Sequence, residues 1–331
     1  INSWDGSESA NWNAANNWSS GSVPGNSDNV IIPNVGTDPV INASDQVGAL
    51  LIQSGGVLTI NNGSYTLTAS SVELADGGSL VISAGELECT GKMDADGTIT
   101  MSGGTLDVNG EFELSATSAE SISGGSIYCA GNWDGENAAN YTLTGGSVVL
   151  DGGTSGSCKT VIMDNISGDV ANSFSGDSYF NNLTVSGYYK NSTYIPYIKG
   201  ALTISNGFTY DAYGVRVFLE GDLVTSGSGT SSWNSSGAGI FTNTQADMYL
   251  HLLGSSNQSV GSFSDEDIGI APYKTGGTAT ANGYISCFDM WIGNSAGSGN
   301  SGTFVVNDET VHVTKLFGYA GTLQISGTGL F

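Results

Sequence analysis

Positive charge is scarce in this 331-residue chain, which has 7 lysine and arginine residues against 31 aspartate and glutamate residues and a formal net charge of −24. A charge of this sign repels phosphate backbones and anionic lipid headgroups. Nucleic acid and anionic membrane surfaces are therefore disfavoured as partners. No segment reaches the roughly 18 consecutive apolar residues that a membrane-spanning helix needs, which argues against membrane insertion.

Cysteine, histidine and proline are also few, with 4, 2 and 5 residues. The four cysteines are scattered, form no CxxC pair and have no histidine nearby in the sequence, so neither a disulfide scaffold nor a zinc site is expected. Charged residues make up 11% of the chain, against roughly 25% in typical soluble domains. Hydroxyl and amide groups must therefore supply most of the surface polarity, which suits stacked β-structure.

Glycine, in contrast, is abundant at 50 residues and recurs in a pattern. A small polar residue, a glycine pair and a β-prone tetrad begin at residues 54, 76, 102, 123 and 144. The first glycines of these pairs are separated by 22, 26, 21 and 21 residues. Short strands joined by arcs, with about 22 residues per cycle, are typical of the coils of a β-solenoid.

A second pattern, apolar-x-apolar-x-Gly-x-apolar, begins at residues 87, 106, 127 and 217. Strict alternation places its apolar side chains on one face of a strand, and the glycine marks a tight arc that needs positive φ or leaves no room for a Cβ. Cys89 and Cys129 hold the same position of this pattern, with Val108 between them. Coils stacked roughly 4.8 Å apart put the two cysteines roughly 9.6 Å apart, so we expect no disulfide between them.

These patterns predict an all-β fold, a right-handed parallel β-helix (β-solenoid) of about a dozen coils with an N-terminal cap. We expect a cap segment over 1–47, regular coils over 48–165, and a continuing, less regular β-helix with loop insertions over 166–331. A separate second domain is the alternative for the last of these segments.

Residues 10–33 contain two tryptophans and six asparagines ahead of a short aliphatic run. The tryptophans could form a platform for a sugar, or they could plug the open end of the solenoid. Because Val30, Ile31 and Ile32 lead into the first regular coil, we predict a plug, with Trp12 and Trp18 as packing residues and the asparagines bonded to turn backbone.

Several of these segments resemble a known protein family. The N-terminal segment is similar to the start of large secreted cell-surface proteins of Bacteroidetes-type bacteria, through Trp4, Trp12, "NNW" at 16–18, "GSVPG" at 21–25 and "DNVIIP" at 28–33. Three later segments resemble recurring sequences in the later coils of these proteins, namely "FNNLTV" at 180–185, "GALTISNG" at 200–207 and "NQSVG" at 257–261. The resemblance spans most of the chain and implies a solenoid, export and a surface role. It names no activity, because the shared motifs are structural. Members commonly carry a C-terminal sorting domain, whereas this sequence stops within strand-like residues, as a cleaved product or a piece of a longer chain would.

Polysaccharide lyases and hydrolases also occur among parallel β-helices, so an enzyme is one alternative. Arg216 is the single arginine, with no acidic cluster beside it in the sequence, and neither Gly-His-Gly nor Arg-x-Lys is present. "GNSAG" at 293–297 matches the nucleophile-elbow pattern, but His251 and His312 lie in strand-like alternation without a strand-turn-helix context. We therefore predict no enzymatic activity.

Four tyrosines, Tyr188, Tyr189, Tyr194 and Tyr197, gather in one segment of the less regular half. Exposed tyrosines stack on sugar faces and supply rigid contact area, so this segment is a candidate glycan or protomer contact. The alternative is that these rings cover the flank of the solenoid.

Two acidic turns are candidate calcium ligands, namely Asp94 with Asp96, and Asp265 with Glu266 and Asp267. The alternative is that they are solvated acidic turns, because no complete loop with a terminal bidentate glutamate is visible. No cofactor is required by the predicted fold, and calcium is the one cofactor that the sequence suggests.

The C-terminal residues Leu323, Ile325, Leu330 and Phe331 form no polar cap, so we expect an assembly end on which a second copy stacks head to tail. The predicted function is that of a non-enzymatic structural protein, a surface or fibre-forming subunit. An adhesin or glycan-binding module is the first alternative and a polysaccharide-active enzyme the second. Expected partners are further copies, other surface components or carbohydrate. The start at Ile1 without a basic segment and the lysine-poor composition indicate a secreted, extracellular or cell-surface product.

Overall fold

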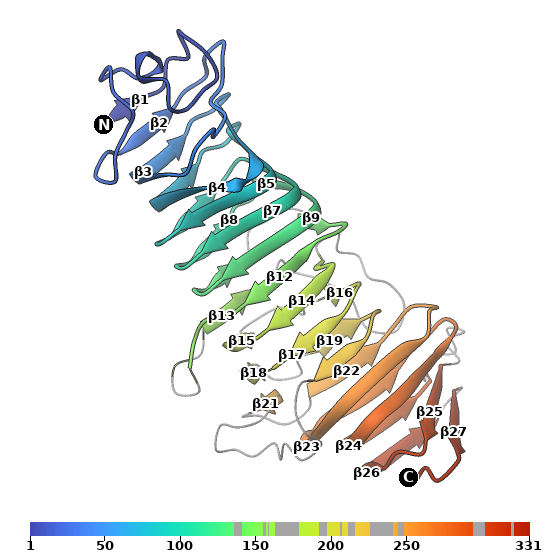
Figure 1. Ribbon diagram of the computed structural model, residues 1–331. Helices are drawn as coiled ribbons and strands as arrows, with labels where there is room; N and C mark the ends of the chain where they lie inside the picture. Colours follow the sequence, from blue (N-terminus) through green and yellow to red (C-terminus); the bar gives the residue numbers. More distant parts are fainter. Residues whose placement is uncertain are drawn as a thin grey trace. The chain divides into compact units, whose positions relative to one another are not determined.

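The computed structural model describes residues 1–135, 141–154, 157, 159–162, 179–191, 197–205, 207–210, 216–225, 241–243, 248–293, 302–318 and 321–331. The described chain is all-β except for one 3₁₀ turn, η1 (Ala15–Asn17), and its strands pair in parallel into stacked coils (Figure 1). The predicted β-solenoid is therefore confirmed, with about ten coils. The chain divides into two compact units, Ile1–Gly152 and Gly153–Phe331. The predicted segments 1–47, 48–165 and 166–331 remain a prediction.

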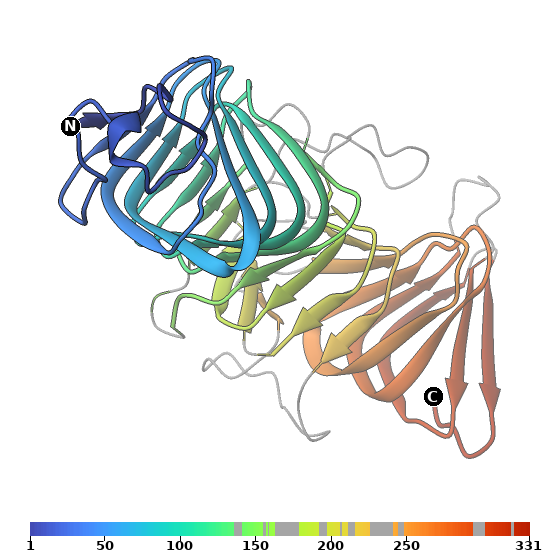
Figure 2. The ribbon, with the colours of Figure 1, turned by 45° about the horizontal axis from the view of Figure 1, so that its top comes forward.

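In the first unit, successive coils follow one another around a common interior (Figure 2). Its strands are β1 (Asn2–Ser3), β2 (Val30–Ile32), β3 (Asp45–Ile52), β4 (Val57–Leu74), β5 (Ser79–Cys89), β6 (Met93–Ala95), β7 (Thr98–Val108), β8 (Phe112–Leu114), β9 (Ala119–Cys129), β10 (Trp133–Asp134), β11 (Tyr141–Leu143) and β12 (Ser147–Leu150).

The strands of the second unit are β13 (Lys159–Ile162), β14 (Asn182–Val185), β15 (Tyr188–Asn191), β16 (Tyr197–Ile198), β17 (Leu202–Ile204), β18 (Gly207–Tyr210), β19 (Arg216–Leu219), β20 (Leu223–Thr225), β21 (Phe241–Asn243), β22 (Met248–Leu252), β23 (Gln258–Pro272), β24 (Thr278–Ile292), β25 (Thr303–Asn307), β26 (Val311–Gly318) and β27 (Thr322–Ser326).

The interior of the first unit consists of columns of apolar side chains, one from each coil. The pairing of β6, β8 and β10 aligns Met93, Phe112 and Trp133, and all three are buried. The rings of Phe112 and Trp133 meet edge to face, with centroids 4.9 Å apart. The alternation read from the sequence therefore predicts the inward faces correctly, and each such burial contributes roughly 1.5–3 kcal/mol.

The glycine of the second pattern stands where coils stack backbone on backbone. Gly91, Gly110 and Gly131 form a column, and a Cβ added to Gly131 would lie 1.9 Å from the Gly110 carbonyl oxygen. Close approach, rather than positive φ, is what requires glycine at this corner, because none of the three has a positive φ.

The glycine pairs recur as one pattern in the sequence, but in the structure they occupy two different corners of the coil. Gly55 and Gly77, the first glycines of their pairs, have φ of 77° and 76° and precede β4 and β5. At the later pairs the positive φ belongs to the second glycine, which lies in a bend within a strand or just before one. These second glycines, Gly104, Gly125 and Gly146, form one column with Gly85, which also has a positive φ but belongs to no glycine pair. The 26-residue step between Gly77 and Gly103 is therefore a change of corner.

Coils of the second unit differ in length, which explains why about ten coils form instead of a dozen. Tyr189 pairs with Phe208, 19 residues later, whereas Phe208 pairs with Phe241, 33 residues later. The chain thus uses residues in its connections that a uniform 22-residue repeat would assign to further coils.

The predicted N-terminal cap is confirmed. Trp4, Trp12 and Trp18 are buried, and the ring of Trp18 meets those of Trp4 and Trp12 edge to face at 5.1 and 4.7 Å. Each indole N–H donates within the cap or to the first coil, for example from Trp12 to Asp45 at 2.7 Å. Asn17 is buried too, and its Oδ1 accepts two backbone N–H groups of the cap. These tryptophans are therefore packing residues, with no ring face open to a sugar.

The cysteine prediction is also confirmed. Cys89 pairs with Val108, and Val108 pairs with Cys129, so the two thiols lie two coils apart and neither forms a disulfide. Cys287 is a free, buried thiol as well, and Cys158 lies outside the described residues. Burial raises the pKa of Cys89 to about 11 and that of Cys129 to about 12, which leaves both groups protonated and unreactive.

Candidate functional site

The tyrosine segment does not form one exposed surface. Tyr189 is fully buried and Tyr197 is 7% exposed, so neither ring can stack on a sugar. Tyr188 lies in β15 with its side chain outside the described part, and Tyr194 lies outside it altogether. Alternation along a strand explains the inward position of Tyr189, and a single sequence cannot show which of two adjacent tyrosines points inward.

Among the residues that the structure describes, no three His, Cys, Asp or Glu side chains are grouped so that they could hold a metal ion. Asp94 lies in β6, 3.6 Å from the ammonium of Lys92. Asp265, Glu266 and Asp267 belong to β23, with side chains outside the described residues, and the calcium proposal for them remains a prediction.

The two histidines lie in different surroundings. His251 is buried among aromatic rings, with centroids 5.0 Å from Phe218 and 5.2 Å from Tyr273. His312 is exposed on β26. The side chain of Arg216 and residues 294–301, with most of the "GNSAG" segment, lie outside the described residues. The described chain also contains no helix with the length and apolarity that a membrane crossing requires.

The last coil of the described chain consists of β26 and β27 (Figure 1), and two columns of apolar side chains end there. Ile270 pairs with Met290 and Met290 with Leu316; the first two are fully buried, whereas Leu316 is 48% exposed. A second column runs through Ala281, Val306 and Ile325, and Ile325 is likewise 48% exposed. Both side chains hold core positions that nothing in the described chain covers.

The strand edges of the last coil are open as well. β26 pairs with β24 and β27 with β25, and no other described strand pairs with either, apart from a bridge between Thr310 and Leu330. Leu330 and Phe331 are exposed beside this coil, and Leu323 is partly buried in β27. An open edge with apolar ends is a surface on which another strand can pair. The residues predicted as an assembly end therefore gather here, and sequence reasoning missed Leu316 because its exposure depends on column position.

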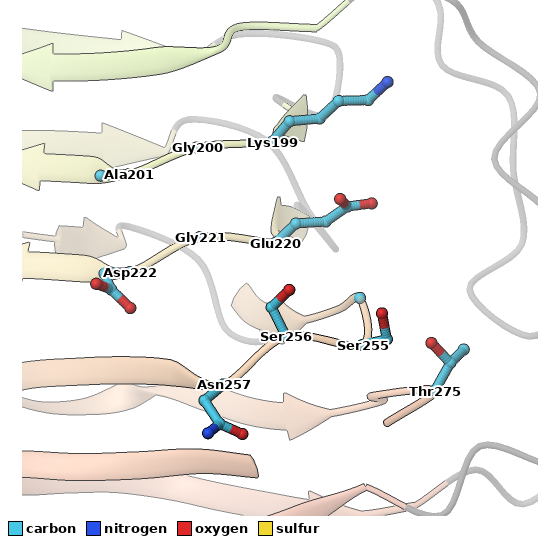
Figure 3. Close-up of a pocket in the computed structure, with 11 residues that line it drawn as sticks. Lys199, Gly200, Ala201, Glu220, Gly221, Asp222, Ser255, Ser256, Asn257 and Thr275 are labelled. Carbon is cyan, nitrogen blue, oxygen red and sulfur yellow. The ribbon is translucent and has the colours of Figure 1, made fainter. Parts of the chain in front are cut away.

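A polar pocket of about 540 Å³ opens in the second unit where three arcs stack (Figure 3). The arcs are residues 199–201, 220–222 and 254–257, and Thr275 adds a fourth contribution. Lys199 and Glu220 reach outward from successive arcs on the same side. Sequence reasoning missed this pocket, although the motif Glu220-Gly221-Asp222 lies within its second glycine pattern.

The pocket exists because one arc is longer than the arc on which it stacks. Leu219 pairs with Leu252 and Leu223 with Val260, so residues 220–222 face the longer run 253–259. Three residues thus face seven, and the extra chain cannot follow the tight glycine corner. The longer arc instead bulges and leaves the space that the pocket occupies.

Buried polar side chains hold the longer arc in place. The amide of Gln258 donates to the carbonyl oxygens of Leu219 and Gly221 at 2.9 and 2.7 Å. Lys274, which is 1% exposed, donates to the Leu253 carbonyl at 3.0 Å and to the Gln258 side chain at 2.6 Å. Burial lowers the pKa of Lys274 to about 8, while the Glu220 carboxylate acts in the opposite direction.

The side chains of Glu220 and Lys199 are each held by a tyrosine, Glu220 by Tyr197 and Lys199 by Tyr179. The hydroxyl of Tyr197 donates to Oε1 of Glu220. Burial, with the Glu220 carboxylate, raises the pKa of Tyr197, so the phenol remains a protonated donor. The ammonium of Lys199 lies 3.5 Å from the ring centroid of Tyr179. The ion pairs between described side chains are those of Lys92 with Asp94, Glu111 and Glu113, and Lys199 and Glu220 do not form one with each other.

Comparison with known proteins gives a family match over about the first third of the chain. Residues 3–109 match a family described as "Domain of unknown function (DUF8693)". This match covers the cap and the first coils and assigns no activity. No curated protein and no solved structure matches the chain significantly.

Proposed function

We propose that this protein is a non-enzymatic structural β-solenoid that assembles head to tail through its last coil. The observation that carries the proposal is the half-exposed core position of Leu316 and Ile325 on strands with open edges. Covering each of these half-exposed side chains would contribute about 1 kcal/mol.

The N-terminal cap differs from the last coil, so a contact between them is heterologous, that is, between unlike surfaces. Ser19 donates its backbone N–H to the Ser3 carbonyl at 2.9 Å, and the Ser19 hydroxyl accepts the Ser3 N–H, so the cap closes the outer edge of β1. In the proposed stack, the last coil of one copy lies against the cap of the next. A contact of this kind that does not close into a ring produces a filament.

A secreted, cell-surface location belongs to the same proposal. The resemblance of the N-terminal segment and later coils to Bacteroidetes-type surface proteins supports it, as do the high content of uncharged polar residues and the net charge of −24. Detection of the native protein at the cell surface by protease shaving and mass spectrometry would test this location.

Sedimentation and negative-stain microscopy of the 331-residue chain test the assembly. We expect filaments or concentration-dependent oligomers for the wild type and their loss in Ile325→Asp and in Leu316→Glu, because a charge at either position would have to be buried in the contact. The matched control is Val224→Asp, which introduces a charge at a residue that is 44% exposed elsewhere in the second unit.

Monomers at every concentration would contradict the proposal. A dimer that grows no further would contradict head-to-tail growth, since it would mean that two copies pair through the same edge.

A further inference from the structure

We propose that the polar pocket of the second unit binds a neutral saccharide. The pocket lies between residues 199 and 275 and is separate from the last coil, so this inference does not depend on assembly. It also differs from the predicted tyrosine surface, because Tyr197 lies behind Glu220 and holds its carboxylate.

The first argument is the pairing of groups at the pocket. Lys199 only donates hydrogen bonds, an ionised Glu220 only accepts them, and the two are not bonded to each other although they reach out on the same side. A hydroxyl group donates and accepts at once. Neighbouring hydroxyls of one ligand can therefore satisfy the ammonium and the carboxylate together.

Charge selects against other small polar ligands. Glu220 and Asp222 give the lining two negative charges, which repel a uronate or a phosphate. The Lys199 ammonium disfavours a cationic group at the position beside it, where the ligand would contact both Lys199 and Glu220. A neutral ligand with many hydroxyls avoids both penalties.

The shape of the wall fits a chain of sugar units. Gly200, Gly221 and Gly254 present backbone without side chains, which lets a ligand approach closely. The arcs of Gly200 and Gly221 stack roughly 4.8 Å apart, close to the length of one sugar ring, and the bulged third arc extends the wall beyond one unit. A volume of about 540 Å³ is within the usual range for small-molecule sites.

The wall is also preorganised. Asp222 uses Oδ1 to accept the Ser259 N–H at 2.7 Å, and Asn257 uses Oδ1 to accept the Thr278 N–H at 3.1 Å. Their remaining polar atoms are thus held at set positions. Beneath the wall, the contacts of Gln258 and Lys274 hold the long arc in place. The protein therefore loses less conformational entropy when a ligand binds.

Saturation-transfer NMR and calorimetry on the 331-residue chain test the proposal, with cellobiose, maltose, lactose, xylobiose and N,N′-diacetylchitobiose as neutral probes and digalacturonate as the anionic one. We expect at least one neutral disaccharide to bind at millimolar concentration or better, and digalacturonate to bind more weakly. Lys199→Met and Glu220→Gln should each weaken binding roughly tenfold, because each removes a hydrogen bond to a charged group.

Lys92→Met and Glu113→Gln are the matched controls. They make the same chemical changes at a corner of the first unit, where Lys92 contacts Glu113, and should leave binding unchanged. Backbone amide shifts of the wild type give a readout that needs no variant, and changes centred on Gly200, Gly221 and Gly254 are expected. The proposal is overturned by no binding of any neutral probe, by binding that survives both pocket variants, by tighter binding of digalacturonate, or by shift changes centred elsewhere.

Discussion

Glu120 provides the sharpest test of how this solenoid is packed. The pairing of β5, β7, β9 and β11 places it in a column with Leu80, Ile99 and Tyr141, so it holds an inward position that earlier coils fill with aliphatic side chains. The residue is 8% exposed, and neither carboxylate oxygen has a hydrogen-bond partner of normal geometry. An unpaired buried carboxylate is costly, and protonation relieves that cost.

The sign and size of the effect follow from the pKa. Burial raises the pKa of Glu120 from 4.5 to about 7, and weaker contributions from Ser118 and from its own backbone act in the opposite direction. Below pH 4.5 the folded and unfolded chains are both protonated and no penalty arises. Stability then falls as the pH rises towards 7, and above that value the full penalty of roughly 3 kcal/mol applies.

Glu120→Gln removes the charge with little change in shape. We expect it to stabilise the first unit at pH 8 by up to roughly 3 kcal/mol and to change little at pH 4.5, so that its stability depends less on pH than that of the wild type. Because solenoid coils can open separately, hydrogen exchange of the β9 amides under native conditions is the most direct measurement, with urea unfolding beside it.

Glu73→Gln is the matched control, because Glu73 is exposed on β4 and the change there should be neutral at both pH values. If the wild type and Glu120→Gln lost stability in parallel between pH 5 and pH 8, the burial of an ionisable Glu120 would be refuted.

Three further outcomes are expected. Gly131→Ala should lower the free energy of unfolding by more than about 2 kcal/mol, since its Cβ would lie 1.9 Å from the Gly110 carbonyl oxygen, whereas Gly36→Ala, with no atom within 4 Å of the added Cβ, should be neutral in urea unfolding. Trp18→Ala should cost roughly 3–5 kcal/mol and speed hydrogen exchange in the cap; slow exchange in the variant would contradict the role of the ring as packing. The Cys129 thiol, with its pKa raised to about 12, should react with a thiol reagent at pH 8 only in denaturant, and labelling of the folded chain would contradict its burial.

Much of the fold is predictable from local pattern. Alternation identifies Met93 and Phe112 as inward residues, and the position of Trp12 and Trp18 ahead of the first coil identifies the cap. The spacing of Cys89 and Cys129 predicts that they form no disulfide with each other. The inward faces and the cysteine spacing depend only on strand period and coil spacing, which the backbone sets for every β-solenoid.

The candidate sites are much less predictable. The pocket depends on three residues of one arc facing seven of the next, a count that appears only when Leu219 is paired with Leu252 and Leu223 with Val260. The inward position of Tyr189 and the buried support from Lys274 likewise depend on partners in other coils. The local sequence around Tyr189 and around Lys274 looks like that of an ordinary exposed connection.

The sequence by itself therefore determined the class of fold and the inward faces of the regular coils, because these follow from periodicity, and it determined the cap, because that segment stands ahead of the first regular coil. Only the tertiary structure decided which corner each glycine occupies, that Glu120 is buried, and that Leu316 and Ile325 are the uncovered ends of core columns. The physical reason is register: in a stack of coils, a residue's surroundings are set by the residues roughly 4.8 Å above and below it, and connections of unequal length make their sequence separation irregular.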